Sequence, residues 1–127
     1  IYEPNYVVVV DDTLLDTVDV TDGLKEDGAI VINTTNDAET LKKKLNGYKG
    51  GIYTIDARSI SIDALGKYFP NTPMLAAIVK VANIMDEKDF LAAMQGSFKH
   101  KFAKKPEVID GNMKALKLAL NEVKKIN

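Results

Sequence analysis

The chain has 127 residues, of which 46% are hydrophobic, so it is long enough to bury a core within one compact domain. Charged residues make up 28% and nearly cancel to a net charge of −1, which argues against binding nucleic acid or anionic lipid through a global field. The chain has no cysteine, which excludes disulfides, thiol nucleophiles and cysteine-ligated iron–sulfur clusters. It has neither a membrane-length apolar run nor a signal-peptide pattern, so we expect a soluble cytoplasmic protein.

The first half of the sequence predicts three buried parallel strands with helices between them. The strands are expected at Tyr6–Asp11, Ala29–Asn33 and Gly51–Asp56, which are continuous apolar runs without in/out alternation. Helical patterns lie between them at Leu14–Leu24 and Asp37–Leu45. This β-α-β-α-β order predicts right-handed crossovers and an α/β fold with a three-layer, Rossmann-like parallel sheet covered on both faces.

The second half reads as helical to its end. A short segment at Ser59–Leu65 ends at Gly66; a buried helix is expected at Thr72–Ala82, and longer ones at Asp86–Lys99 and Glu107–Lys125. The lysine face of the last helix is interpreted as a solvated surface. Since no linker interrupts the chain, we expect residues 1–127 to form a single domain.

The start of the chain suggests a fragment or a processed protein. Ile1 is not an initiator methionine, and the first strand is expected within a few residues of it. Three strands are also few for a sheet with this much helix. We therefore expect at least one further strand and helix in a segment preceding Ile1.

Three carboxylates raise the possibility of a phosphoacceptor signalling domain. Asp11 and Asp12 end the first strand and Asp56 ends the third, as the Mg²⁺-binding acids and phosphoacceptor of a receiver domain would. Such a domain also needs two further strands, ending in a small hydroxyl residue and a lysine. The next long apolar run instead begins with "NTP" (71–73), a typical helix start, which places Lys80 in the middle of a helix. The second half of the chain therefore argues against this hypothesis.

The acidic pair then has a structural interpretation. Asp12 is placed to N-cap a helix starting near Leu14, and Asp11 to bind amides of the same turn. Ligands of open parallel sheets meet the carboxyl ends of the strands, so these acids, residues 33–35 and Asp56 should form one polar rim. Phosphate-binding glycine motifs are absent from the sequence, and the single histidine, His100, lies in a basic stretch. These 127 residues lack the parts for independent catalysis.

Several segments together resemble one family. The stretches "EPNYVVVVDDTLL" (3–15), "GLKEDGAIVINT" (23–34), "YTIDA" (53–57) and "PNTPMLAAIVKVANIM" (70–85) resemble, in order and spacing, the gamma subunits of pyruvate:ferredoxin oxidoreductase, also called pyruvate synthase. The tail "PEVIDGNMKALKLALNEVKK" (106–125) fits the same pattern. Gamma subunits of this 2-oxoacid oxidoreductase family normally begin with a strand, a glycine-rich turn and a helix. This sequence starts after them, so it corresponds to the C-terminal part of the gamma domain.

The resemblance implies an activity for the complete enzyme. Such enzymes oxidatively decarboxylate pyruvate with coenzyme A to acetyl-CoA and CO₂, reduce ferredoxin, and can run in reverse. Thiamine diphosphate with Mg²⁺ is expected in the alpha and beta subunits, and [4Fe–4S] clusters in the beta and delta subunits. The gamma chain is then non-catalytic and metal-free, and docks onto its partner subunits near the coenzyme A entry.

Four polar residues are candidates for contact with a partner subunit or with coenzyme A. Asn71 and Thr72 have either this role or that of a helix cap and turn, and Asn33 and Thr34 on the sheet rim have the same two interpretations. Three hypotheses remain open at this point: a gamma-subunit component, a receiver-like domain, and an α/β module that binds a small molecule by itself. Association with thiamine- and cluster-bearing subunits, phosphorylation of Asp56 by a small phosphodonor, and thermal shifts with coenzyme A or nucleotides separate them.

Overall fold

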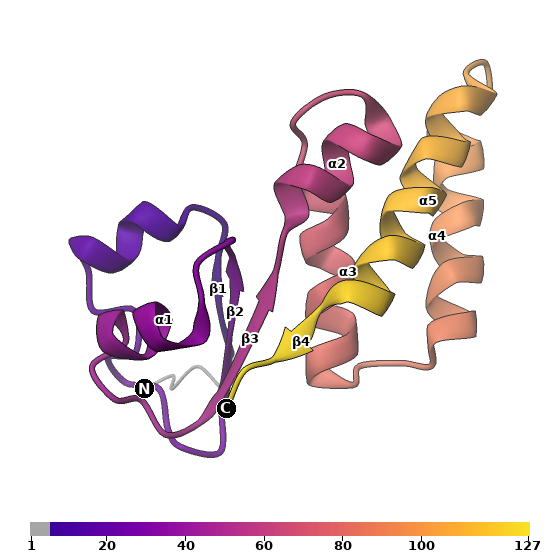
Figure 1. Cartoon of the computed structure of the whole chain (residues 1–127). Helices are drawn as coiled ribbons and strands as arrows, with labels where there is room; N and C mark the ends of the chain where they lie inside the picture. Colours follow the sequence, from indigo (N-terminus) through magenta and orange to yellow (C-terminus); the bar gives the residue numbers. More distant parts are fainter. Residues whose placement is uncertain (1–5) are drawn as a thin grey trace. The chain divides into compact units, whose positions relative to one another are not determined.

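The computed structural model describes residues 6–127 and has two compact units (Figure 1). The sheet unit contains the described residues up to Asp56 together with Val123–Asn127. The helical unit is Ala57–Glu122. Strands and helices alternate in the first unit and four helices follow in the second, which confirms the predicted α/β class with a helical C-terminal half.

The sheet unit has four strands in the order β1-β2-β3-β4. Strands β1 (Tyr6–Val9), β2 (Ala29–Asn33) and β3 (Gly51–Ile55) are parallel to one another, with Tyr6 opposite Ala29 and Ala29 opposite Gly51. They match the three predicted strands to within two residues. The fourth, β4 (Lys124–Lys125), runs antiparallel to β3.

The fourth strand corrects the prediction that the last helix continues to Lys125. Helix α5 ends at Glu122, and the chain then pairs with β3, where the Ile126 amide donates to the Ile52 carbonyl at 2.9 Å. The side chain of Asn127 extends this pairing: its Oδ1 accepts from the Ile52 amide at 3.0 Å and its Nδ2 donates to the Gly50 carbonyl at 2.6 Å. The tail thus pairs with backbone groups along β3 that would otherwise lie unpaired at the edge of the sheet. This pairing stabilises the extended tail more than the helical pattern of its lysine-rich sequence stabilises a helix. The strand expected before Ile1 stays a prediction.

The connection between β1 and β2 also differs from the prediction. The sequence predicts a helix over Leu14–Leu24, but only a short 3-10 helix, η1 (Asp12–Asp16), forms, followed by turns. The segment is rich in Asp, Thr and Val, which favour local turns over helix. Asp19 shows the competition directly, because its Oδ1 accepts from both the amide and the hydroxyl of Thr21, at 3.1 and 2.6 Å.

Helix α1 (Ala38–Lys44) connects β2 to β3, as predicted. Its N-cap is Asp37, whose Oδ1 accepts from the Thr40 amide at 2.8 Å. Hydrogen bonding from the side chain and the backbone of Thr40 lowers the pKa of the Asp37 carboxyl. One apolar cluster joins η1 and α1 to the sheet. It consists of Val9, Leu15, Leu24, Ile30, Ile32, Leu41, Leu45 and Ile52.

The helical unit packs three helices around the fourth. Helices α2 (Ala57–Leu65), α3 (Asn71–Ala82) and α4 (Glu87–Lys101) each contact α5 (Pro106–Glu122). Alanines on α3 and α5 are fully buried, which allows the two helices to lie close together; they are Ala76, Ala77, Ala115 and Ala119. Helices α3, α4 and α5 lie where helical patterns were predicted, with ends shifted by at most two residues or, at the end of α5, by three. Helix α2 includes the short segment Ser59–Leu65, for which the sequence predicts no specific element.

Gly111 of α5 has a packing role that only the structure shows. A Cβ atom at this position would lie 2.8 Å from the Ala64 carbonyl oxygen and 3.0 Å from Leu65 Cδ2 at the end of α2. The absence of a side chain therefore allows α2 and α5 to approach each other closely.

Candidate functional site

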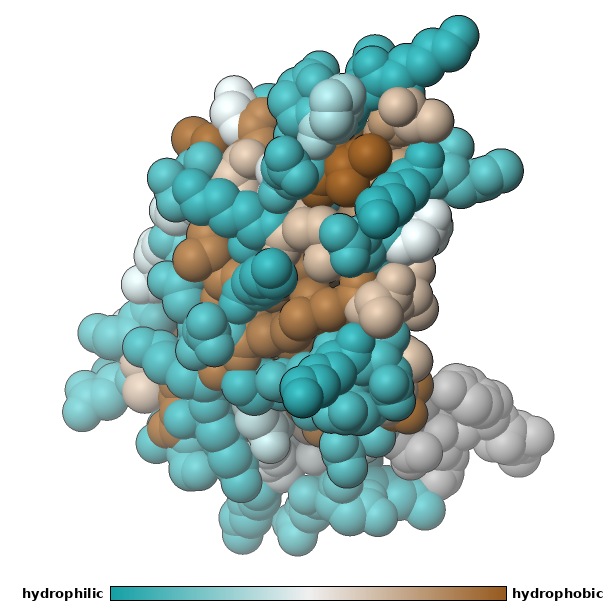
Figure 2. Space-filling model, turned by 90° about the vertical axis from the view of Figure 1, so that its right-hand side faces the viewer, coloured by the Kyte–Doolittle hydropathy of each residue, from teal (hydrophilic) through white to brown (hydrophobic). Residues whose placement is uncertain are grey.

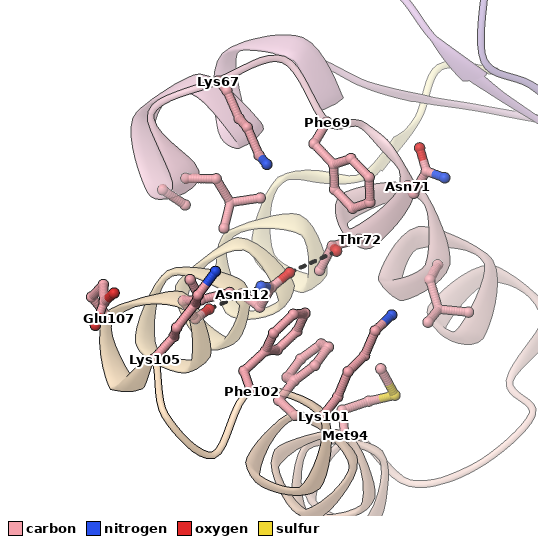
Figure 3. A pocket seen from close by; sticks show the side chains of 15 residues that line it. Lys67, Phe69, Asn71, Thr72, Met94, Lys101, Phe102, Lys105, Glu107 and Asn112 are labelled. Carbon is pink, nitrogen blue, oxygen red and sulfur yellow. Dashed lines mark hydrogen bonds between the residues drawn. The ribbon is translucent and has the colours of Figure 1, made fainter.

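A cavity of about 730 Å³ lies within the helical unit (Figure 3). Its walls come from the end of α2, the α2–α3 connection, the start of α3, the second half of α4, and the start of α5. The lining residues are Ala64, Leu65, Lys67, Phe69, Asn71, Thr72, Leu75, Met94, Phe98, Lys101, Phe102, Lys105, Glu107, Val108 and Asn112. Its size falls in the range of ligand-binding pockets, and its lining combines apolar side chains with a few polar ones.

Three lysines and one glutamate are the charged residues of this cavity. Lys67 lies over the ring of Phe69, with Nζ 5.8 Å from the ring centroid, and Lys101 lies over Phe102 at 5.4 Å. Figure 3 shows Lys67 and Lys105 extending into the cavity from opposite walls. In the part of the chain that the structure describes, none of the three lysines has a carboxylate within 4.0 Å. The cavity therefore combines an apolar interior with an excess of positive charge.

Two predicted site residues, Asn71 and Thr72, line this cavity, but neither caps a helix. Helix α3 starts at Asn71, so its N-cap residue is Pro70, which makes no side-chain capping hydrogen bond. The predicted cap is wrong because the helix starts one residue early and the Thr72 hydroxyl is used elsewhere. It donates to Asn112 Oδ1 at 2.9 Å, the dashed line of Figure 3.

The hydrogen bond between Thr72 and Asn112 satisfies two buried polar groups. Thr72 is 7% exposed and Asn112 6% exposed, and Asn112 Nδ2 also donates to the Val108 carbonyl at 2.9 Å. A buried hydroxyl and a buried amide stabilise each other in this way, because either would carry a desolvation cost alone. Asn71, by contrast, is exposed on the cavity rim.

The two other predicted site residues lie at the carboxyl ends of the strands in the sheet unit. Asn33 Nδ2 donates to the Val10 carbonyl at 3.0 Å, and the Thr34 amide donates to the Ile55 carbonyl at 3.0 Å. Thr34 Oγ1 also donates to Asp12 Oδ2 at 2.6 Å. These bonds join the ends of the three parallel strands, as expected of a polar rim. Asn33 and Thr34 thus belong to one unit, and Asn71 and Thr72 to the other.

For the acidic pair on this rim, the predicted amide contact of Asp11 is confirmed and the predicted capping role of Asp12 is wrong. Asp11, not Asp12, is the N-cap of η1, and its Oδ1 accepts from the Thr13 amide at 3.0 Å and the Thr13 hydroxyl at 2.7 Å. This hydrogen bonding lowers the pKa of the Asp11 carboxyl. Asp12 instead accepts from Thr34 and from Asn36, at 2.6 and 3.3 Å. The reason is that the helix already starts at Asp12, so its cap is one residue earlier than predicted and the Asp12 side chain is available to the neighbouring strand end.

Sequence reasoning did not predict the lysines and phenylalanines that dominate the cavity. The stretch "KHKFAKK" (99–105) contains Lys101, Phe102 and Lys105, and its density of lysines around a phenylalanine is the signal that could have indicated a binding surface. By itself the pattern is equally typical of an exposed basic segment. His100, in the same stretch, is exposed on α4.

Neither a metal centre nor a membrane span is found in residues 6–127. No group of three or more His, Cys, Asp or Glu side chains there is arranged to hold a metal ion. No helix in this range combines the length and apolar character that crossing a bilayer requires. A receiver-like pocket is also not formed by these residues, because α2 directly follows Asp56 and the additional strand, β4, is antiparallel.

The profile of the pyruvate ferredoxin/flavodoxin oxidoreductase family matches residues 1–122. The chain belongs to this family. It is 44% identical over 125 residues to pyruvate synthase subunit PorC of Methanocaldococcus jannaschii, covering 98% of this chain and 63% of that protein. It is 39% identical over 105 residues to the common subunit gamma of the pyruvate/ketoisovalerate oxidoreductases of Thermococcus litoralis, covering 83% of this chain and 57% of that protein.

A solved structure of the same family has the same fold. The crystal structure of pyruvate oxidoreductase subunit PORC from Thermotoga maritima superposes with a TM-score of 0.86 at 38% identity. The match covers 100% of this chain and 67% of that one. The resemblance inferred from the sequence motifs is confirmed by these comparisons. The chain spans about three-fifths of the length of the curated relatives that it matches, with 63% and 57% of two of them covered.

Proposed function

We propose that this chain is a gamma-subunit component of an enzyme that oxidatively decarboxylates pyruvate with coenzyme A. The products are acetyl-CoA and CO₂, ferredoxin is reduced, and the reaction is reversible. The observation that carries this proposal is the match of the entire chain to a PORC structure at a TM-score of 0.86 and 38% identity. At that identity both the fold and the side chains that contact partners can be retained.

The chain acts as a structural component and does not itself hold the redox or thiamine cofactors. Thiamine diphosphate, Mg²⁺ and the [4Fe–4S] clusters belong to alpha, beta and delta partner subunits in the cytoplasm. The residue composition supports this division, since an iron–sulfur cluster needs thiolate ligands and the chain has no cysteine. Residues 1–127 then form the C-terminal part of the gamma domain.

The four polar candidates have different parts in this role. Asn71 is exposed on the cavity rim, so it is the one placed for a direct contact with a partner subunit or with coenzyme A. Thr72 is buried and bonded to Asn112, so it shapes the cavity wall. Asn33 and Thr34 hold the strand ends in position beside Asp12 and support the rim of the sheet.

Pyruvate is the proposed oxoacid. Four of the relatives are named pyruvate synthase subunit PorC, and four others are named as a subunit common to pyruvate and ketoisovalerate oxidoreductases. A common subunit of that kind leaves the choice of oxoacid to other subunits. We therefore expect that substitutions in this chain leave the preference between pyruvate and branched-chain oxoacids unchanged.

The test is affinity purification of the tagged chain from its own cells under anaerobic conditions. The expected result is co-purification of larger subunits carrying thiamine diphosphate and iron–sulfur clusters, with pyruvate- and coenzyme A-dependent reduction of ferredoxin. Asn71→Ala should raise the KM for coenzyme A or weaken subunit association without unfolding the chain. A chain that is recovered alone, with no such subunits and no oxoacid-dependent activity, would refute the proposed function.

A further inference from the structure

The cavity of the helical unit leaves apolar side chains open to solvent. Phe69 and Leu75 both line it, and they are 41% and 39% exposed. Next to Phe69 in the chain, Tyr68 is 55% exposed. On the face of the molecule in Figure 2, hydrophobic surface lies in hollows bordered by hydrophilic side chains. Exposed apolar surface rimmed by polar residues marks a surface that another molecule covers.

The lining of this cavity carries more positive than negative side chains. Lys67 comes from the connection between α2 and α3, and Lys101 and Lys105 come from the stretch that ends α4 and leads into α5, while Glu107 is the single acidic side chain among the lining residues. Within residues 6–127, the interactions found for Lys67 and Lys101 are with aromatic rings, and none of the three lysines has a carboxylate partner. Three such ammonium groups favour an acidic occupant.

The distribution of these groups favours a polypeptide over a small anion. The cavity has neither an arginine nor a glycine-rich turn to hold one phosphate from several sides, and its lysines are spread around the rim. Among the lining residues the lysines are exposed, whereas Phe98 is buried and Leu65 and Phe102 are half-buried. An apolar centre with a charged rim is the usual arrangement of a protein–protein contact.

We propose that this cavity is the docking site for an acidic segment of a partner subunit. The segment inserts an aliphatic or aromatic side chain between Phe69 and Phe102 and places carboxylates beside Lys67, Lys101 and Lys105. This inference rests on the proposed function, since it takes the occupant from the subunits with which the chain assembles. It adds to that function the place of contact and the chemistry of the partner.

The test uses the assembled complex and a zero-length carbodiimide reagent, which joins a lysine to a carboxylate only in direct contact. The expected result is cross-links from Lys67, Lys101 or Lys105 to aspartates or glutamates of another subunit, identified by mass spectrometry. The same three lysines should react with an acetylating reagent at least about fivefold more slowly in the complex than in the free chain. Lys88 and Lys99, exposed lysines outside the cavity, are the internal controls and should change little.

A charge reversal completes the experiment. The triple variant K67E/K101E/K105E should weaken association with the partner subunits by about tenfold or more, and the loss should shrink at high salt. The control variant K88E/K99E/K117E reverses the same number of exposed lysines outside the cavity and should associate normally. Circular dichroism of both free variants establishes that they fold.

The outcomes separate this inference from the proposed function. Association of the native chain with normal lysine reactivity in the complex, or equal behaviour of the two triple variants, would overturn the docking site alone. Protection of the lysines by coenzyme A or inorganic phosphate in the free chain, without a subunit, would also overturn it and assign the cavity to a small anion. Failure of the native chain to associate with any subunit would refute the proposed function itself.

Discussion

The hydrogen bond between Thr72 and Asn112 gives the most direct test of the structure around the cavity. Thr72→Val keeps the shape of the side chain but removes the hydroxyl that donates to Asn112 Oδ1 at 2.9 Å. Because Asn112 is only 6% exposed, its oxygen then has no donor and little access to water. Leaving a buried acceptor unpaired costs about 1–3 kcal/mol, so the free energy of unfolding should fall by that amount.

The assay is urea unfolding of the chain followed by far-ultraviolet circular dichroism. With a slope of about 1–3 kcal/mol/M, Thr72→Val should lower the midpoint by about 1 M. Thr72→Ser retains the hydroxyl and loses one methyl group, so its cost should be about 1 kcal/mol. Ser97→Ala, at an exposed position of α4, is the control and should stay within about 0.5 kcal/mol of the native chain.

A double-mutant cycle decides whether the cost belongs to this hydrogen bond. Asn112→Leu removes the acceptor, and the variant with both Thr72→Val and Asn112→Leu leaves no unpaired group between the two helices. Its cost should therefore be less than the sum of the single costs by at least about 0.5 kcal/mol. Additive costs, or a Thr72→Val variant as stable as the native chain, would refute the reasoning.

Three further predictions concern stability. Gly111→Ala should destabilise the chain because the added Cβ would lie 2.8 Å from the Ala64 carbonyl oxygen. Gly96→Ala is the matched control: its Cβ has no neighbour within 4 Å, so it should stabilise the helix by about 0.5–1 kcal/mol. Thermal unfolding of the two variants compares these effects. Lys80 Nζ donates to the Leu120 carbonyl near the end of α5, so Lys80→Met should cost about 1 kcal/mol in urea unfolding, and no loss would mean that this contact is not formed in solution. The pKa of the Asp37 carboxyl is lowered on folding, so the ionised carboxylate stabilises the folded chain above its unfolded pKa of about 3.9, and this stabilisation is lost as pH falls through its folded pKa. The difference in free energy of unfolding between the native chain and Asp37→Asn should therefore shrink below about pH 4. A difference that does not change with pH would contradict this.

The parallel strands and most of the helices could be predicted from the sequence because their signals are local. The apolar runs of β1, β2 and β3 have the length and β-branching of buried strands, and α1 has its cap, Asp37, at the residue where the pattern begins. The motif resemblance likewise depends on residues in a fixed order along the chain. The family could therefore be recognised from the sequence alone.

Local signals failed where a distant partner or a turn competed with a helix. The segment 14–24 has a helical apolar pattern, yet Asx-type hydrogen bonds such as those of Asp19 stabilise turns there. At Thr72 the sequence predicts a cap, but the hydroxyl bonds to Asn112, forty residues further along the chain. No property of the residues next to Thr72 indicates that partner.

What the sequence by itself determined is the α/β class, the order of its main elements and the family. Tertiary structure alone decided that Lys124 and Lys125 pair with β3, and that lysines and phenylalanines from separate segments surround one cavity. The physical reason is that periodicity and propensity report only on neighbours in the chain. The pairing of a strand edge and the walls of a cavity depend instead on groups that meet only when the chain has folded.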